Sequence, residues 1–239
     1  MTEEQKIWFE KLSQKRNNTA TTLMKDFAVG NMWNSVVEKY SDQAHFIYEL
    51  LQNADDAKAT QSEFVLHNEG LYFKHNGTEH FWVSNPETEN YDKEHSIKIG
   101  DINVITAVAQ SDKDKSSIGK FGVGFKAVFQ YTKTPHIHDC DFQFRIENFI
   151  VPIDDGDFSL EINREKEETV FYFPFDKEDK PKETAYFDIL EKLKSLNYPI
   201  LFLSNLQKVE WRADSETGEY VKQIKKYKEY NDIVVRKFD

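Results

Sequence analysis

Cysteine and long apolar runs are what this sequence most clearly lacks. Cys140 is the single cysteine among 239 residues, which excludes an internal disulfide framework and a multi-cysteine zinc site. No stretch approaches the roughly 20 consecutive apolar residues of a membrane helix. Residues 1–12 do not show the basic and then apolar segments of a signal peptide. These absences predict a cytoplasmic protein.

Positive charge is scarce as well. The chain has 31 Lys and Arg against 42 Asp and Glu, which gives a net charge of −11. Binding to a phosphate backbone requires clustered positive charge. The basic cluster near the C-terminus consists of Lys222, Lys225, Lys226 and Lys228, and we interpret it as a solvated strand or helix face. We therefore expect no direct nucleic-acid binding and no membrane association.

Aromatic side chains are abundant, with 19 Phe, 11 Tyr and 4 Trp, and each can bury roughly 150–250 Å² in a core. Apolar residues follow helical spacing early in the chain and a period of two later. A short helix is predicted at the N-terminus, where it opens with a Thr2–Gln5 capping box and has Ile7, Trp8 and Leu12 on one face. Further helices are predicted at 33–58, 101–110, 126–129 and 183–196. The predicted strands lie at 62–67, 71–77, 141–148, 158–163, 168–175, 206–213, 219–227 and 232–238, and the polar stretch 84–96 is expected to be irregular.

Helices concentrated early and strands late predict an α+β layered domain. We divide the chain into an N-terminal helical segment at 1–30, a main domain at 31–212 and a C-terminal strand extension at 213–239. The extension is expected to continue into domains that this chain does not contain.

The predicted helix around residues 49–57 has a polar stripe. Glu49, Asn53 and Asp56 share one side at 3.6 residues per turn, with Gln52 at the edge of the stripe. Apolar residues occupy most of the remaining circumference, which is typical of a buried helix. A carboxylate beside an amide can activate a water molecule, and the amide oxygen can bind Mg²⁺. The alternative is a stripe that simply faces solvent.

A glycine-rich segment precedes the helical run at 126–129. It consists of Gly119, Lys120, Phe121, Gly122, Val123, Gly124 and Phe125. Glycines let a backbone approach phosphate closely, and helix N-terminal amides attract anions. The segment is not a Walker A loop, because Phe125 stands where that motif requires lysine. It is not a dinucleotide fingerprint either, because its glycine order is reversed and no strand precedes it.

Taken together, ELLQNADDA, HNG, IGKFGVGF and a late Glu-Thr before a strand resemble the GHKL ATPase superfamily in order and spacing. Within it, the sacsin-like branch, which reads ELIQNADDA and GRFGIGF at these places, is the most similar. The resemblance spans about Tyr40 to Trp211. It implies the Bergerat fold, a two-layer α/β sandwich whose mixed, mostly antiparallel sheet is covered by helices on one face.

The resemblance also implies roles for residues of the helical stripe. Glu49 matches the general base that activates the attacking water, and Asn53 matches the Mg²⁺ ligand. Asp56 matches an acidic residue beside the nucleotide on the same helix.

Further roles follow for the phosphate and base ends of the nucleotide. The amides from Lys120 to Phe125 match the loop around the γ-phosphate. Lys113 resembles a phosphate-contacting lysine at the start of a lid, and Thr169 resembles the threonine that shares a water molecule with the adenine-binding aspartate. Residues 110–117 have no apolar anchor, so we expect this lid to become ordered when the γ-phosphate binds.

The chain departs from the superfamily at the adenine position. Most members have Asp-x-Gly there, whereas this chain has His75-Asn76-Gly77. A neutral imidazole can accept one hydrogen bond through a ring nitrogen but lacks the two oxygens of a carboxylate. His75 and Gly77 are therefore predicted to contact the base with altered specificity, unless His75 is only a turn residue at a strand end.

The function implied by the resemblance is a slow ATPase that binds ATP or ADP with Mg²⁺ and whose lid controls a protein partner or a fused effector domain. It leaves open an ATP-dependent homodimer. A histidine kinase is disfavoured, because His45 lies inside the polar-striped helix and no separate phosphoacceptor helix is visible. The alternative is a non-catalytic nucleotide-sensing module, by analogy with modules of bacterial defence or restriction-associated systems. The sequence does not separate slow hydrolysis from none.

Overall fold

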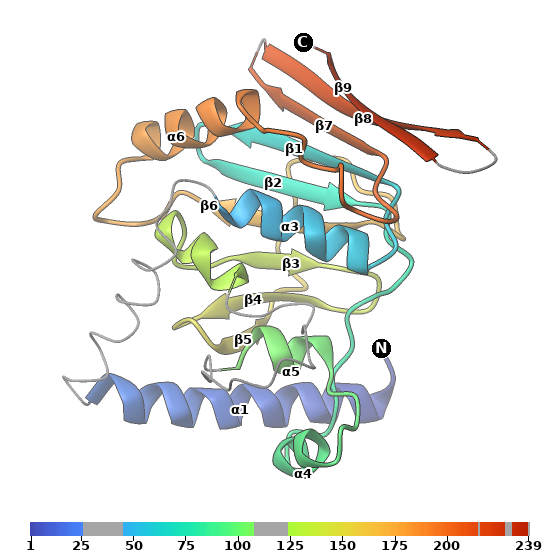
Figure 1. The fold of residues 1–239 in the computed structure, drawn as a ribbon. Helices are drawn as coiled ribbons and strands as arrows, with labels where there is room; N and C mark the ends of the chain where they lie inside the picture. The colour runs from blue at the N-terminus through green and yellow to red at the C-terminus, as the bar shows by residue number, and fades with distance from the viewer. Residues whose placement is uncertain (26–44, 108–123, 215, 228–230, 239) are drawn as a thin grey trace.

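The computed structural model describes residues 1–25, 45–107, 124–214, 216–227 and 231–238. Its centre is a nine-stranded sheet in the order β5-β4-β3-β6-β2-β1-β7-β8-β9, and α3 lies over the middle of the sheet in Figure 1. The strands are β1 (Gln61–His67), β2 (Gly70–His75), β3 (His136–His138), β4 (Gln143–Glu147), β5 (Val151–Asp154), β6 (Thr169–Pro174), β7 (Lys208–Ala213), β8 (Glu216–Lys226) and β9 (Asn231–Phe238). The helices are α1 (Glu3–Lys25), α3 (His45–Asp56), α4 (Glu89–Glu94), α5 (Asp101–Ile105), the 3₁₀ helix η1 (Phe125–Gln130) and α6 (Lys182–Lys194).

The sheet is mixed. β1 pairs with β2 in the predicted antiparallel hairpin but runs parallel to β7 on its other side. The other neighbouring strands described are antiparallel to each other. The predicted α+β class and mixed, mostly antiparallel sheet are therefore confirmed.

The main core lies between the helices and one face of the sheet. Phe73 and Phe171 of the central strands belong to the same buried cluster as Leu12 of α1, Leu50 of α3 and Ile189 of α6. The opposite face is covered in part by the segment 155–168, where Ile162 packs with side chains of β1, β2 and β6. At about 25 cal/mol per Å² of buried apolar surface, the aromatic-rich first interface is the main source of stability.

The first helix confirms the capping box and corrects the predicted length and packing face. Thr2 N–H donates to Gln5 Oε1 at 3.0 Å and Gln5 N–H donates to Thr2 Oγ1 at 3.3 Å. The helix has 23 residues rather than being short. Leu12 is buried as expected, but Ile7 is 46% exposed and Phe9 takes the inward position instead. The ring of Phe9 lies 6.0 Å from that of Phe144 in β4 and so packs against the sheet.

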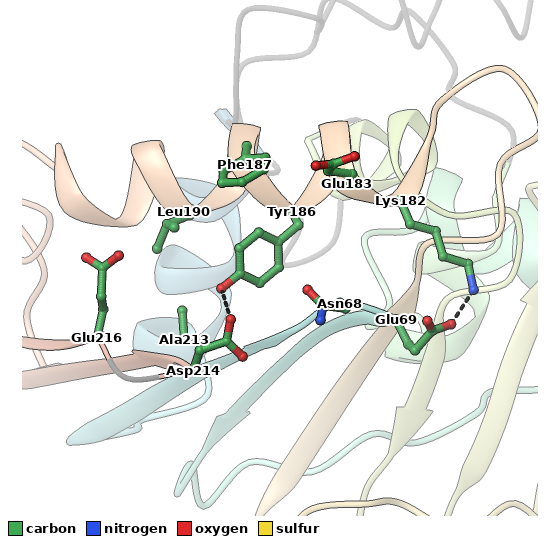
Figure 2. Close-up of a pocket in the computed structure, with 10 residues that line it drawn as sticks. All are labelled: Asn68, Glu69, Lys182, Glu183, Tyr186, Phe187, Leu190, Ala213, Asp214 and Glu216. Atoms are coloured by element: carbon green, nitrogen blue, oxygen red, sulfur yellow. Dashed lines mark hydrogen bonds and ion pairs between the residues drawn. The ribbon is translucent and has the colours of Figure 1, made fainter.

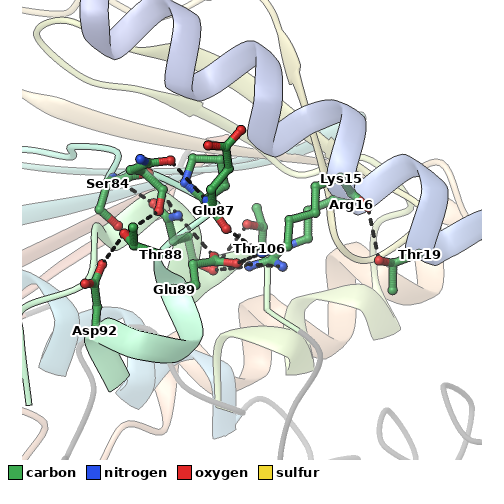
Figure 3. Close-up of polar contacts among 12 residues, drawn as sticks. Lys15, Arg16, Thr19, Ser84, Glu87, Thr88, Glu89, Asp92 and Thr106 are labelled. Atoms are coloured by element: carbon green, nitrogen blue, oxygen red, sulfur yellow. Dashed lines mark hydrogen bonds and ion pairs between the residues drawn. The ribbon is translucent and has the colours of Figure 1, made fainter. Parts of the chain in front are cut away.

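An ion-pair network ties α1 to α4 (Figure 3). Arg16 Nη2 lies 2.7 Å and Lys15 Nζ 2.6 Å from the carboxylate of Glu89. Asn103 Nδ2 of α5 donates to the same carboxylate at 3.1 Å and also to Ser84 O at 3.2 Å. The stretch 84–96 was predicted to be irregular but contains the short helix α4. Contacts with α1 and α5 hold this helix in place, and such distant contacts leave no mark on the local sequence pattern.

Other sequence predictions are corrected by tertiary packing. Residues 158–163 form no strand; the ring of Phe158 instead lies 4.3 Å from that of His136. The helical run at 126–129 is the 3₁₀ helix η1. The short strands β3 and β5 were not expected as separate elements. Of the helix predicted at 33–58, α3 is the described part, and residues 33–44 lie outside the described residues.

Two further sequence predictions concern the basic cluster near the C-terminus and the absence of membrane-spanning helices. Lys222, assigned to a solvated basic face, is buried and donates a hydrogen bond from its ammonium group to Leu203 O, whereas Lys225 and Lys226 are exposed and Lys228 lies outside the described residues. Within the described ranges, no helix combines the length and the apolar character needed to cross a lipid bilayer.

Candidate functional site

Helix α3 carries the polar stripe on one side and is buried on most of its remaining surface. Ile47, Leu51 and Ala54 are fully buried against the core. The helix ends where Lys58 adopts the left-handed conformation, with φ of 65°, and Ala59 N–H donates to Ala54 O at 2.9 Å, a Schellman-type end. The last turn of the helix is therefore firmly placed.

The residues of the stripe differ in exposure. Asn53 is only 5% exposed, Glu49 and Asp56 are half-buried, and Gln52 is exposed. The predicted inward direction of the stripe is thus confirmed for Asn53, and Gln52 lies on the solvent side.

The structure brings Glu49 and Gly124 together. A Cβ built on Gly124 would lie 2.1 Å from Glu49 Oε2, which is far inside van der Waals contact. A side chain at position 124 would therefore have to displace the Glu49 carboxylate, which glycine leaves in place.

Two residues anchor the chain just after that contact. The ring of Phe125 lies 6.1 Å from that of Phe171 in the core. Lys126 Nζ donates to Ile105 O at 2.7 Å and to Phe149 O at 2.6 Å, and burial lowers the pKa of this ammonium group to about 7. Lys113, Gly119, Lys120, Phe121, Gly122 and Val123 lie outside the described residues.

Three of the predicted site residues, Asn53, His75 and Thr169, line one small cavity of about 10 Å³ between α3, β2 and β6. That volume holds about one water molecule. Asn53 Nδ2 is buried and has no hydrogen-bond partner among the described residues. A buried amide without a partner is costly, by about 1–3 kcal/mol, which is typical of a group that awaits a ligand or water.

His75 is held as a neutral ring. It is 3% exposed, and burial lowers its pKa to about 4. Gly77 N–H donates to His75 Nδ1 at 3.1 Å, so the proton of the neutral ring lies on Nε2. This corrects the expected role: the acceptor nitrogen is already used by the backbone, and the ring offers a donor instead.

Gly77 places this turn against the end of α3. A Cβ there would lie 2.7 Å from Ala57 O, and the same carbonyl accepts hydrogen bonds from Thr78 N at 2.9 Å and Glu79 N at 3.1 Å. The HNG turn is therefore both a structural turn and one wall of the cavity.

Thr169 is directly opposite His75 in the β2–β6 ladder. Its hydroxyl donates to Asp139 Oδ1 at 2.8 Å. Asp139 is fully buried and also accepts from Phe81 N–H at 2.5 Å. The sequence analysis missed Asp139, which supplies a carboxylate behind this wall; no local pattern marks it, because its partners come from distant parts of the chain.

The neighbouring acids of α3 have different roles. Asp55 is 8% exposed, and its carboxylate accepts from the backbone N–H groups of Ser204, Asn205 and Leu206 at 2.6–3.0 Å. Asp55 therefore fixes the segment before β7 and is a structural residue. Asp56 is the acid on the side of the stripe, as predicted, and Asp55 was not singled out.

A larger cavity of about 540 Å³ lies elsewhere, between the β1–β2 turn, α6 and the β7–β8 turn (Figure 2). Tyr186 donates to Asp214 Oδ2 at 2.8 Å across it, and Lys182 pairs with Glu69 at its other end. None of the predicted site residues within the described ranges lines this cavity.

Comparison with known proteins finds a family match over a segment that contains α3 and the HNG turn. Residues 29–144 match the Sacsin domain family. The matched segment is sacsin-like. Glu49, Asn53, His75 and Gly124 fall within it, whereas Thr169 lies beyond it.

Two relatives are similar over part of the chain. The protein NO VEIN of Arabidopsis thaliana is 33% identical over 117 residues, which cover 46% of this chain and 4% of that protein. Human sacsin is 32% identical over 114 residues, which cover 44% of this chain and 2% of that protein. The chain therefore matches only a small part of the length of each relative.

Proposed function

We propose that this protein binds ATP with Mg²⁺ at the site formed by α3, the HNG turn and the glycine-rich segment, and that it hydrolyses ATP slowly. The observation that supports it most is the contact between Glu49 and Gly124, one helical turn from Asn53, whose buried Nδ2 has no hydrogen-bond partner among the described residues. A phosphate chain held at the glycine backbone would lie beside both side chains.

The roles follow from the chemistry of each group. Asn53 would bind Mg²⁺ through its amide oxygen, and the ion, when bound, neutralises phosphate charge. The Glu49 carboxylate is half-buried and can take a proton from a water that attacks the γ-phosphate. A positioned general base contributes roughly 10²–10⁴-fold to such a reaction.

The base end of the nucleotide requires the cavity to widen. A purine is much larger than the present cavity of about 10 Å³, so side chains at its open side must move aside on binding. Association that needs such a change is slower than rigid docking. A lid at residues 110–117 would close over the γ-phosphate and control a protein partner or a fused domain.

Calorimetric titration with Mg·ATP tests the binding site. The Asn53→Ala variant is expected to lose metal-dependent binding, because the amide oxygen is removed. The Gln52→Ala variant changes an exposed side chain on the same helix and should bind as the wild type does. Undiminished Mg·ATP binding by a folded Asn53→Ala variant would contradict the assignment of Asn53.

A turnover assay tests hydrolysis separately. Glu49→Gln should bind ATP and hydrolyse it roughly 10²–10⁴-fold more slowly than the wild type. If the wild type binds Mg·ATP and shows no turnover above the Glu49→Gln variant, the protein is a nucleotide-sensing module rather than an ATPase.

A further inference from the structure

We propose that His80, Cys140 and Glu167 form a binding site for a divalent transition-metal ion, with Zn²⁺ as the best match. The site goes beyond the proposed nucleotide function, and it adjoins the small cavity, because His80 also lines that cavity. Thiolate, imidazole and carboxylate are the three ligand types that Zn²⁺ takes in proteins.

The sheet topology brings these residues together from three separate parts of the chain. β3, β6 and β2 are consecutive in the sheet, and each is antiparallel to its neighbour. The end of β3, the start of β6 and the end of β2 therefore meet at one edge. Cys140 follows β3, Glu167 precedes β6 and His80 follows β2.

The donor atoms already have the spacing of a tetrahedral site. Cys140 Sγ lies 3.6 Å from His80 Nε2 and 3.3 Å from Glu167 Oε2, and His80 Nε2 lies 3.7 Å from Glu167 Oε2. Bonds of about 2.3 Å to sulfur and about 2.0–2.2 Å to nitrogen or oxygen place tetrahedral ligands about 3.4–3.6 Å apart. An ion can thus enter with shifts of a few tenths of an ångström.

The imidazole of His80 is oriented for this role. Its Nδ1–H donates to Asp139 Oδ1 at 2.9 Å, because a carboxylate can only accept there. Asp139 is itself fixed by Phe81 N–H and by the Thr169 hydroxyl. The Nε2 lone pair of His80 is therefore directed at Cys140, and Asp139 is a positioning residue of the kind that accompanies metal-bound histidines.

The charge around the site also favours a cation. Glu167 and Asp139 are the carboxylates in contact with His80, and the opposing charge near the thiol is Arg164. Burial and the hydrogen bond from Cys140 to Glu167 raise the pKa of the thiol to about 11. Binding of the ion would release this thiol proton to solvent, one per ion, and form the sulfur–metal bond.

Two of the proposed ligands, His80 and Cys140, together with Asp139, resemble a nucleophilic Cys-His-Asp arrangement, but that alternative fits less well. Both roles require a thiolate, and the Glu167 carboxylate beside the thiol disfavours that second negative charge unless a bound cation offsets it. The side chains of His80 and Glu167 are 27% and 74% exposed, so the fourth position of a metal site would be open to water.

A second cluster provides a contrast. His136 and His138 are both within hydrogen-bond distance of Asp155 Oδ2, at 2.6 and 3.2 Å. Arg145 Nη1 lies 3.0 Å from Asp155 Oδ1. The guanidinium already balances the only carboxylate in this group, so a divalent ion would add uncompensated charge to a buried position.

Cobalt titration of the metal-stripped protein, without nucleotide, tests the proposal. Co²⁺ bound by a thiolate gives a charge-transfer band, and Cys140 is the only sulfur of that type in the sequence. We expect the charge-transfer band to saturate at one Co²⁺ per chain and to appear together with the visible bands of tetrahedral Co²⁺. Added Zn²⁺ should displace the Co²⁺ and remove these bands. Cys140→Ser should abolish the charge-transfer band.

The other variants separate a built site from a reactive surface thiol. His80→Gln and Glu167→Gln should each weaken Co²⁺ binding, and Asp139→Asn should weaken it about 10–100-fold while the thiol remains. Glu165→Gln, in the same turn, and His138→Gln, in the contrast cluster, should bind as the wild type does. Zn²⁺ should also protect Cys140 from alkylation. A wild-type protein without the band, or His80→Gln and Glu167→Gln variants with unchanged affinity, would overturn the proposal.

Discussion

Among single residues, Gly124 makes the most demanding contact, because its Cα lies against the carboxylate of Glu49. Gly124→Ala would push that carboxylate out of position, and a misplacement of about 1 Å at a reacting group can cost roughly 100-fold in rate. We expect the variant to fold and to lose about that factor in ATP turnover. In the matched control, Gly156→Ala, the new Cβ would meet its nearest neighbour at 3.4 Å, and turnover should be unchanged.

His75 determines which base edge the site can recognise. Its Nδ1 accepts from Gly77 N–H, so Nε2–H can donate to a 6-oxo group but cannot accept from a 6-amino group. Inosine triphosphate, which has the oxygen, should therefore bind more tightly than ATP. His75→Asp should reverse the order, with a change in the affinity ratio of about tenfold for one hydrogen bond. A wild-type preference for ATP in competition binding would show that Nε2–H does not contact the base edge.

At the scale of elements, Lys126 links η1 to the end of α5 and makes stability depend on pH. Its pKa is lowered from 10.5 to about 7 by burial, so the unfolded chain binds one more proton than the folded protein between these values. The free energy of unfolding should therefore rise with pH across that window, by up to about 5 kcal/mol.

Denaturant unfolding at several pH values between 7 and 10.5 measures this dependence. Lys126→Met removes the titrating group, so its unfolding free energy should rise less steeply than that of the wild type. The comparison of slopes holds even if Met destabilises the protein by leaving Ile105 O and Phe149 O without their donor. Parallel slopes would mean that Lys126 stays protonated in the folded state.

For the whole molecule, Glu89 connects the N-terminal helix to the rest of the fold. Arg16 and Glu89 are each only 11% exposed, and removing one partner of a buried pair leaves the other charge uncompensated. Glu89→Gln should lower the free energy of unfolding by about 3 kcal/mol. Glu87→Gln, which breaks the exposed pair with Lys11, should cost less than about 1 kcal/mol. Equal effects of the two variants in denaturant unfolding would contradict a central role for Glu89.

The features that could be predicted from the sequence are those with local causes. The Thr2–Gln5 capping box, the β1–β2 hairpin and α6 were found because caps, turns and periodicity act over a few residues. β3 has three residues and α4 six, too few for a period to show. The pattern at 158–163 reflects side chains of a loop that pack on the face of the sheet rather than a strand that pairs in it.

For the candidate site, the sequence predicted that Asn53 faces inward and assigned Asn53, His75 and Thr169 to one nucleotide site; the structure places these three around one small cavity. It did not predict the direction of hydrogen bonding at His75, because that depends on the fold of its own turn. Asp139 and the approach of Cys140 to Glu167 could not be found from the sequence, since strands distant in the chain bring them together.

The parallel pairing of β1 with β7 has a consequence for synthesis on the ribosome. β1 can pair with β2 as soon as the hairpin emerges, but Gln61 pairs with Lys208, about 150 residues later. At about 5–20 residues per second, one edge of β1 waits roughly 7–30 s for its partner. An unpaired strand edge is a template for wrong pairing with another chain. A nascent chain of this protein should therefore associate with holding chaperones until β7 has emerged.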